Sequence, residues 1–296
     1  MMPRPGRPRR CRATLCLSAA LAVVACTAGC GSAEPNASEA SSSASTASGA
    51  ADLEGMFDAG GHELYLRCRG SGGPTVLYLH GYSVDAQTAS ANADSGIAVE
   101  RAMPDNLRYC AYDRRNVARS DEVDGVGTGV DAVEDLHALM VSADIDPPYL
   151  LLGASWGGMV AFQYAATYPD EVVGMVLLDA AFPGELALEQ LFPEEDRLTH
   201  EEYFEEDEKF DQLAAYEEAA GLPMPAVPVT YLLAMPFGWE QGVPEYDAAI
   251  RPAIEEYVAG FAPGRLEEVE SPHWMENAVP QKIVDEVTTM AESVGG

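Results

Sequence analysis

The segment Gly153-Ala154-Ser155-Trp156-Gly157-Gly158 places a serine hydroxyl in a G-x-S-x-G pattern. An apolar run, 148–152, precedes the pattern and the helix-forming stretch 159–162 follows it, which favours a tight turn between a strand and a helix. Ser155 would stand on that turn at the helix N-terminus, where the helix dipole favours a developing negative charge. We therefore expect Ser155 to be a nucleophile for acyl transfer rather than a structural serine in a Gly-rich turn.

A second motif, His80-Gly81-Tyr82, directly follows the apolar run 75–79. A loop at this place can complete an oxyanion hole, in which two backbone N–H groups stabilise the negative carbonyl oxygen of the reaction. We expect these donors to be the N–H groups of Tyr82 and Trp156. The side chain of His80 is expected to fix the backbone of the loop rather than to take part in the chemistry.

An imidazole base is expected from Ser271-Pro272-His273-Trp274, because this segment follows the last predicted strand. A neutral His273 can take the Ser155 proton and return it to the leaving group. The other histidines fit this role less well: His62 lies on an early strand, His137 in a helix and His200 in an acidic run.

The elements that must position these residues alternate between short apolar runs and helical stretches. This order predicts an α/β fold with a mostly parallel sheet and helices on both faces. Strands are predicted at 62–68, 75–79, 108–112, 148–152, 173–178, 227–234 and 265–270, and helices at about 129–143, 156–168 and 279–292. The run 75–79 has no polar row and should be a central strand.

With these motifs the sequence resembles the α/β-hydrolase superfamily, in its branch of esterases, lipases, haloperoxidase-like enzymes and prolyl aminopeptidases. His80-Gly81 is similar to the oxyanion loop and Gly153–Gly157 to the nucleophile elbow. The segment from Tyr112 to Asp121 resembles the pattern Y-D-x-R-G-x-G-x-S, with Asn116 and Ala118 where glycines are usual. The resemblance covers about 62–182 and, less closely, 227–292, and implies an α/β-hydrolase fold with a helical cap insertion.

The resemblance also bears on the acid and on two cysteines. The family allows a triad carboxylate after either of two strands, which makes Asp179 the preferred acid and Glu240 the alternative. It also implies that the strands carrying Cys68 and Cys110 are neighbours, so that these residues can form a disulfide. Two buried free thiols are the alternative.

Residues 184–222 interrupt the strand–helix alternation with a dense run of acids among aromatic residues. Acids facing solvent and aromatics facing the protein would make an amphipathic cap over the carboxyl edge of the sheet. The alternative is a solvated excursion without a role in binding. The acids are Glu194, Glu195, Asp196, Glu201, Glu202, Glu205, Glu206, Asp207 and Glu208, and the apolar residues are Leu191, Phe192, Tyr203, Phe204 and Phe210.

The first 29 residues have the pattern of a lipoprotein-type signal peptide, with arginines, then an apolar run from Leu15 to Ala25, then small residues. Cys30 is the preferred lipidation site and Cys26 the alternative; an ordinary secretory signal is the competing interpretation. A Ser/Ala-rich disordered tether (30–52) would lead to a hydrolase domain at 53–296. We expect export, with a lipid anchor on the outer side of a bacterial membrane, or secretion.

These residues predict a serine hydrolase that cleaves carboxylic esters through an acyl-enzyme. The aromatics Tyr82, Trp156, Phe182 and Trp239 would line its apolar pocket. A prolyl-type aminopeptidase is the alternative, and a non-catalytic binding lipoprotein is a third reading. The expected partner is a small ester or amide; no metal or organic cofactor is implied, and membrane contact is through the anchor alone. A formal charge of −31 argues against nucleic acid.

Overall fold

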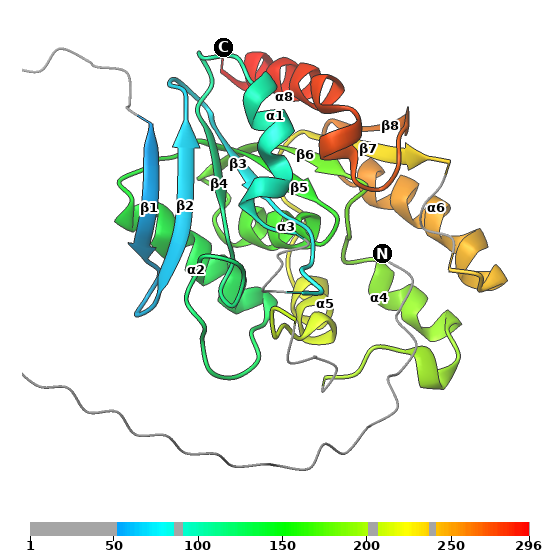
Figure 1. The fold of residues 1–296 in the computed structure, drawn as a ribbon. Coiled ribbons are helices and arrows are strands. Elements are labelled where there is room, and N and C mark those ends of the chain that lie inside the picture. Colours follow the sequence, from blue (N-terminus) through cyan, green and yellow to red (C-terminus); the bar gives the residue numbers. More distant parts are fainter. Residues whose placement is uncertain (1–51, 86–90, 201–206, 237–240, 296) are drawn as a thin grey trace, which may run out of the picture. The chain divides into compact units, whose positions relative to one another are not determined.

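The computed structural model describes residues 52–85, 91–200, 207–236 and 241–295 (Figure 1). The predicted signal peptide, Cys26 and Cys30, the tether up to residue 51, and both Trp239 and Glu240 lie outside the described residues. Of the helices described, none has the length and apolar character needed to cross a bilayer.

An eight-stranded sheet in the order β1-β2-β4-β3-β5-β6-β7-β8 forms the centre of the described residues. β2 is antiparallel to both of its neighbours. The strands β4, β3, β5, β6, β7 and β8 run parallel to one another, so their carboxyl ends meet at one edge of the sheet. The predicted α/β-hydrolase architecture is confirmed. The strands are β1 Leu53–Asp58, β2 Glu63–Arg69, β3 Thr75–Leu79, β4 Tyr109–Tyr112, β5 Tyr149–Ala154, β6 Val172–Leu178, β7 Val229–Met235 and β8 Gly264–Glu270.

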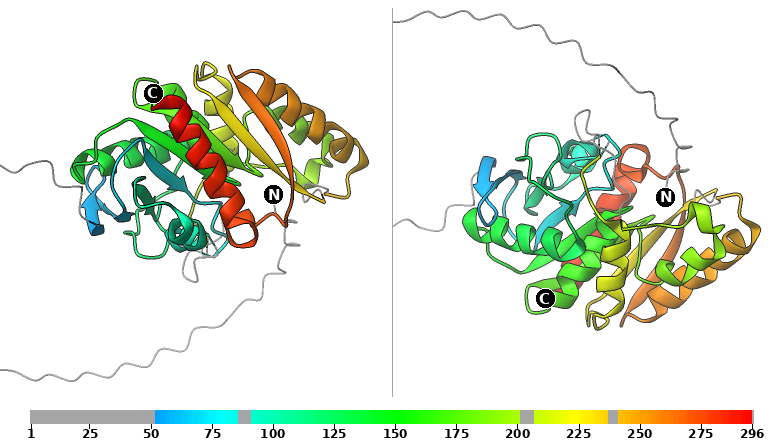
Figure 2. Two further views of the ribbon diagram at one scale, coloured as in Figure 1. Left: turned by 90° about the horizontal axis from the view of Figure 1, so that it is seen from above. Right: turned by 90° about the horizontal axis from the view of Figure 1, so that it is seen from below.

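Helices cover both faces of the sheet (Figures 1 and 2). On one face α1 and α8 pack together, and Figure 2 shows α8 crossing the sheet; α2 and α3 pack together on the other face. The longer helices are α1 Ile97–Ala102, α2 Gly129–Ser142, α3 Gly157–Thr167, α5 Gln212–Ala220, α6 Pro244–Ala259 and α8 Pro280–Val294; α4 Glu185–Leu188 and α7 Met275–Ala278 are single turns.

The strand β3 shows why this sheet must lie between two layers. All five of its residues are buried. Successive side chains of a strand point to opposite faces, and accordingly Val76 and Tyr78 join the core beneath α1 and α8, whereas Leu77 and Leu79 join the core beneath α2 and α3. A strand without a polar row is therefore stable only with helices on both sides.

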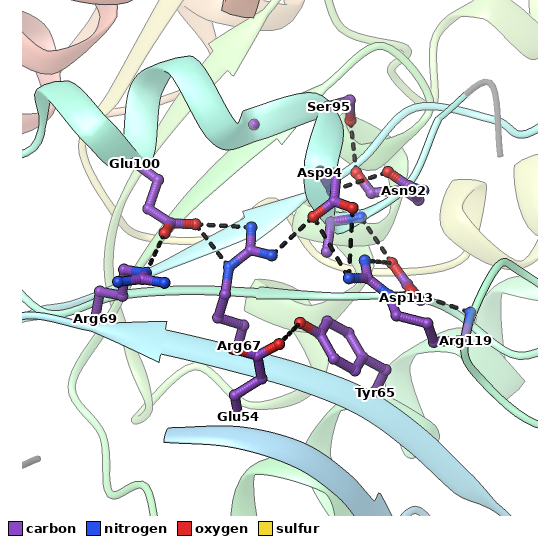
Figure 3. A network of polar contacts seen from close by, with 12 residues as sticks. Glu54, Tyr65, Arg67, Arg69, Asn92, Asp94, Ser95, Glu100, Asp113 and Arg119 are labelled. Atoms are coloured by element: carbon purple, nitrogen blue, oxygen red, sulfur yellow. Dashed lines mark hydrogen bonds and ion pairs between the residues drawn. The ribbon is translucent and has the colours of Figure 1, made fainter. Parts of the chain in front are cut away.

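A disulfide and an ion pair attach β2 to the neighbouring elements β4 and α1. Cys68 and Cys110 face each other across β2 and β4 and are joined by a disulfide. On the α1 side, the buried guanidinium of Arg67 pairs with Glu100 at 2.8 Å, and a wider network of ion pairs surrounds this contact (Figure 3). Because Glu100 lies on α1, the pair fixes that helix against the sheet.

The insertion between β6 and β7 contains α4, the 3₁₀ turns η2 Glu189–Leu191 and η3 Glu194–Asp196, and α5. Of the aromatic residues predicted to face the protein, Phe192 and Phe210 are buried, whereas Tyr203 and Phe204 lie outside the described residues. Phe210 and Tyr216 contact the Trp156 ring at centroid distances of 5.6 and 5.3 Å. The insertion thus contacts the segment that follows β5, at the carboxyl edge of the sheet.

The expectation that the acids of this insertion face solvent is wrong at two positions. Asp207 and Glu208 are buried. Each has a polar partner beneath the insertion: the Tyr82 hydroxyl donates to Asp207 Oδ2 at 3.3 Å, and Arg114 pairs with Glu208. Burying a carboxylate is costly unless it is paired and hydrogen-bonded, and these two are. Leu191 departs in the opposite direction, since its side chain is exposed.

Candidate active site

Ser155 stands on a turn whose backbone geometry requires small neighbours. Its φ of +50° is unusual for a residue with a side chain. A β-carbon on Gly157 would collide with the carbonyl oxygen of Leu79 and lie 2.8 Å from that of His80, and one on Gly153 would lie 2.8 Å from the carbonyl oxygen of Gly157. The glycines therefore allow β5, α3 and the end of β3 to meet around the serine.

The sheet register brings the ends of several strands to the level of Ser155. Leu79 pairs with Gly153 and Leu178 with Ala154, so the loops after β3 and β6 begin beside the turn that carries the serine. The backbone N–H of Ser155 donates to the carbonyl of Leu178 at 3.0 Å. Asp179 consequently follows directly, on the neighbouring strand end.

Three predicted site residues form a continuous hydrogen-bonded chain. His273 Nε2 lies 3.0 Å from Ser155 Oγ, and His273 Nδ1 lies 2.6 Å from Asp179 Oδ2. The other carboxylate oxygen of Asp179 accepts the backbone N–H of Ala234, on β7, at 3.1 Å. The Asp179 side chain is fully buried and that of His273 is 16% exposed. The carboxylate is thus held inside the protein while the imidazole reaches the site surface.

The structure brings Asp179, and not another described carboxylate, to His273 Nδ1. Asp179 itself has φ +42°, a backbone conformation that turns the chain sharply after β6. Glu240, the alternative acid, lies outside the described residues, so the structure does not compare the two.

The two expected oxyanion donors belong to segments that lie beside the serine. Trp156 precedes α3, whose first N–H groups have no partner within the helix. Tyr82 follows Gly81, where an added β-carbon would lie 3.3 Å from Ser155 Cβ. Within the described residues, neither backbone N–H donates a hydrogen bond to the protein. Both groups are therefore available to a substrate oxygen.

His80 has the structural placement expected of it. Its ring is fully buried; Nδ1 lies 2.8 Å from the carbonyl oxygen of Gly81, and Nε2 lies 3.3 Å from the backbone N of Arg114. Burial, and then the charge of Arg114, hold the pKa of His80 well below its usual value. A neutral ring whose Nε2 accepts a hydrogen bond carries its proton on Nδ1 and donates it to Gly81.

The loop after β4 adopts the conformation that glycines usually provide. Asn116 and Ala118 have φ values of +62° and +50°. The Asn116 side chain stabilises the turn, because its Oδ1 accepts the backbone N–H of Val123 at 2.7 Å and its Nδ2 donates to the carbonyl of Glu208 at 3.2 Å. An asparagine tolerates this backbone region better than most residues.

Sequence reasoning did not identify Arg114 or Glu208 as residues near the site. Both are buried and form an ion pair directly behind the His80–Tyr82 loop. The sequence did contain part of the information that points to Arg114, because this residue closely follows a strand that ends at the carboxyl edge of the sheet. Its partner, Glu208, lies in a run of nine acids that the sequence pattern predicts to face solvent.

No group of three or more His, Cys, Asp or Glu side chains arranged to hold a metal ion is found in the part of the chain that the structure describes. The described residues bring to the site a hydroxyl, an imidazole and a carboxylate, together with two backbone N–H groups.

Comparison with known proteins agrees with this architecture. Residues 74–219 match the family model described as "alpha/beta hydrolase fold". Among solved structures, an esterase from Exiguobacterium antarcticum superposes with a TM-score of 0.55 at 17% identity, covering 80% of this chain and 98% of that one. The chain therefore has the α/β-hydrolase fold.

Relatives in sequence match over shorter segments. An uncharacterised protein of Bacillus subtilis (strain 168) is 30% identical over 45% of this chain and 49% of its own length. A monoacylglycerol lipase of Rattus norvegicus is 34% identical over 40% of this chain and 35% of its own. A putative proline iminopeptidase of Mycoplasma pneumoniae is 32% identical over 42% and 38%. The chain thus spans half or less of each of these relatives.

Proposed function

We propose that the protein is a serine hydrolase that cleaves carboxylic esters through a covalent acyl-enzyme, with Ser155, His273 and Asp179 as its triad. The observation that carries the proposal is the hydrogen-bonded chain from Ser155 Oγ through the imidazole to the buried carboxylate. Such a chain activates a hydroxyl that is otherwise a weak nucleophile.

The steps follow from the geometry. His273 Nε2 accepts the hydroxyl proton as Ser155 Oγ bonds to the ester carbonyl carbon, and Asp179 holds Nδ1–H and stabilises the imidazolium. The carbonyl oxygen becomes an oxyanion facing the N–H groups of Tyr82 and Trp156. Collapse breaks the bond to the alcohol, which takes the proton from Nε2. Water then repeats the sequence on the acyl-enzyme and releases the acid.

Phosphonate labelling tests the nucleophile. A fluorophosphonate probe should label the wild type and fail to label Ser155→Ala, whereas Ser142→Ala, which removes a hydroxyl at the end of α2, should label at the wild-type rate. Labelling of Ser155→Ala at the wild-type rate would refute the assignment.

A substrate comparison tests the reaction class. Acyl esters of increasing chain length are assayed beside amino-acid amides, including prolyl amides. We expect faster turnover of the esters. The aminopeptidase alternative draws on relatives such as the putative proline iminopeptidase and on acids in the insertion, but the buried Glu208 is already paired with Arg114. Faster turnover of the amides would favour the aminopeptidase.

We also propose, from the N-terminal pattern alone, that the chain is exported and lipid-anchored through Cys30. Metabolic labelling with a radioactive fatty acid should mark the wild type and Cys26→Ser but not Cys30→Ser. Labelling lost only in Cys26→Ser would move the site to Cys26, and an unlabelled, secreted wild type would exclude the anchor.

A further inference from the structure

The buried side chain of Arg114 joins the oxyanion loop to the insertion. Its Nη1 donates to the carbonyl oxygen of His80 and its Nη2 to that of Gly81, both at 2.7 Å. On its other side the guanidinium contacts both carboxylate oxygens of Glu208, with Nη2 at 2.9 and 3.1 Å and Nε at 3.2 Å. The two side chains are only 3% and 1% exposed.

The contact with Gly81 bears directly on the proposed oxyanion hole. The carbonyl of Gly81 and the N–H of Tyr82 belong to one peptide unit, which is planar and, when trans, points these groups in opposite directions. Hydrogen bonds that fix the carbonyl oxygen therefore also fix the direction of the N–H. Gly81 O receives two such bonds, one from Arg114 Nη2 and one from His80 Nδ1. The peptide cannot rotate without breaking both.

Glu208 is the group that keeps Arg114 in this place. A buried guanidinium that loses its partner carries a severe desolvation cost and tends to rearrange toward water. The position of Glu208 is in turn fixed through its backbone: its N–H donates to the carbonyl of Ser83 at 3.3 Å and its carbonyl accepts from Asn116 at 3.2 Å. The insertion is thus attached to the loops after β3 and β4.

We propose that Arg114 and Glu208 are positioning residues, which hold the Gly81–Tyr82 peptide with its N–H toward the nucleophile and so make the oxyanion hole depend on the docked insertion. The inference rests on the proposed function. Its consequence is specific: the pair stabilises the oxyanion, which exists only in the transition state and intermediates, so its loss should lower kcat and leave ground-state binding nearly unchanged.

Three variants separate positioning from folding. Glu208→Gln removes the counter-charge, and Arg114→Lys keeps a charge but lacks the planar fork that reaches two carbonyls and a carboxylate together. The double variant Arg114→Met/Glu208→Leu replaces the pair by apolar side chains, an exchange that often preserves or improves stability. It should fold, yet lose the Arg114 bonds to both carbonyl oxygens.

The control is Glu100→Gln. Glu100 is a buried carboxylate paired with the buried Arg67 on the α1 side of the sheet (Figure 3), so this variant imposes a comparable loss of a buried ion pair at another place. It should lower the melting temperature and keep kcat within about twofold of wild type, because neither residue contacts the oxyanion loop.

The measurements are kcat and KM for p-nitrophenyl acetate, the inhibition constant of an alkylboronic acid, which mimics the tetrahedral intermediate, and thermal unfolding. Removing one oxyanion donor costs about 10²–10³ in kcat. Since His80 still holds the peptide, we expect a loss of about 10–10² in kcat for each variant, with KM within about threefold. Boronate binding should weaken in proportion to kcat/KM.

Wild-type kcat and boronate affinity in the folded double variant would overturn the inference, as would a loss confined to KM. Failure of Glu208→Gln to fold does not remove the test, because the double variant and Arg114→Lys are measured beside it. A wild type that hydrolyses no ester and takes up no phosphonate would instead refute the proposed function, and the two failures are therefore distinguishable.

Discussion

At the scale of single residues, the proposed triad depends on the arrangement of Asp179. Its two carboxylate oxygens have different hydrogen-bond partners: Oδ1 accepts the backbone N–H of Ala234, and Oδ2 faces His273 Nδ1. The first bond orients the carboxylate and the second selects the imidazole tautomer whose Nε2 can accept a proton.

We predict that Asp179→Asn lowers kcat for a short-chain ester by about 10⁴-fold. An asparagine fills the same space but can present its NH₂ group to Nδ1, which favours the tautomer with the proton on the wrong nitrogen. Steady-state kinetics measure the effect, and circular dichroism shows that the fold is kept.

Asp135→Asn is the matched control, since it neutralises another buried carboxylate, which pairs with Arg115 away from the triad. If Asp179→Asn retains more than about a tenth of the wild-type kcat, another carboxylate, with Glu240 as the first candidate, must serve the histidine.

The sequence was informative about residues wherever a short motif carries the chemistry. Ser155 and His273 follow from local patterns, because each lies in a loop directly after an apolar strand. Asp179 could be preferred but not separated from Glu240, since the choice depends on which strand end lies nearer His273. The partnership of Arg114 and Glu208 spans 94 residues, and no local pattern reports a contact across that distance.

At the scale of elements, the turn between β5 and α3 determines how closely three loops approach one another. The helix begins at Gly157, where the chain passes against the end of β3. Buried strands with unbroken apolar runs were predictable to within a few residues. β1 was missed because Glu54 and Gly55 interrupt its apolar residues, and α6 because Pro252 interrupts its helical pattern. The order of the strands is a long-range property that apolar runs do not encode.

We predict that Gly157→Ala destabilises the protein by about 1–3 kcal/mol, the usual cost of overpacking, and lowers kcat more than tenfold. The new methyl group would push against the carbonyl oxygens of Leu79 and His80, and so displace the oxyanion loop from Ser155. Urea unfolding and ester hydrolysis measure the two effects.

Gly55→Ala provides the comparison, because a β-carbon on Gly55 meets only the Phe57 ring at 3.6 Å. It should change neither quantity appreciably. Equal effects of the two substitutions would mean that the close contact at Gly157 has no special importance for the site.

At the scale of the whole molecule, stability depends on a disulfide and on buried titratable groups. The disulfide between Cys68 and Cys110 closes a loop across 42 residues of sequence separation. On the loop-entropy relation such a cross-link contributes about 4 kcal/mol by restricting the unfolded chain.

We predict that the variant Cys68→Ala/Cys110→Ala melts roughly 8–16 °C below the wild type and keeps kcat at 25 °C within about twofold. Calorimetry with and without a reductant checks this: the reductant should lower the melting temperature of the wild type toward that of the variant and leave the variant unchanged. An unchanged melting temperature of the wild type, under a reductant shown to have reduced the disulfide to two thiols, would contradict the prediction.

The buried His80 should give the molecule an acid-sensitive stability. Its pKa is held well below the usual value of about 6.5 in the folded protein, by burial first and by the charge of Arg114 second. Unfolding exposes the ring to water, so below pH 6.5 the His80 imidazole binds a proton in the unfolded chain but not in the native protein. Native stability is therefore complete above this pH and decreases as the pH falls below it.

We predict that the free energy of unfolding of the wild type decreases through His80 as the pH falls from 7.5 to 5.5, and that His80→Gln lacks this decrease. Burial raises the pKa of Glu208 to about 7, against the influence of Arg114, and this group acts in the opposite direction, with stability decreasing as pH rises toward 7. Glu208 is present in both proteins, so the difference between their urea-unfolding profiles isolates the histidine. A parallel pair of profiles for wild type and His80→Gln would show that the buried ring does accept a proton in the folded state.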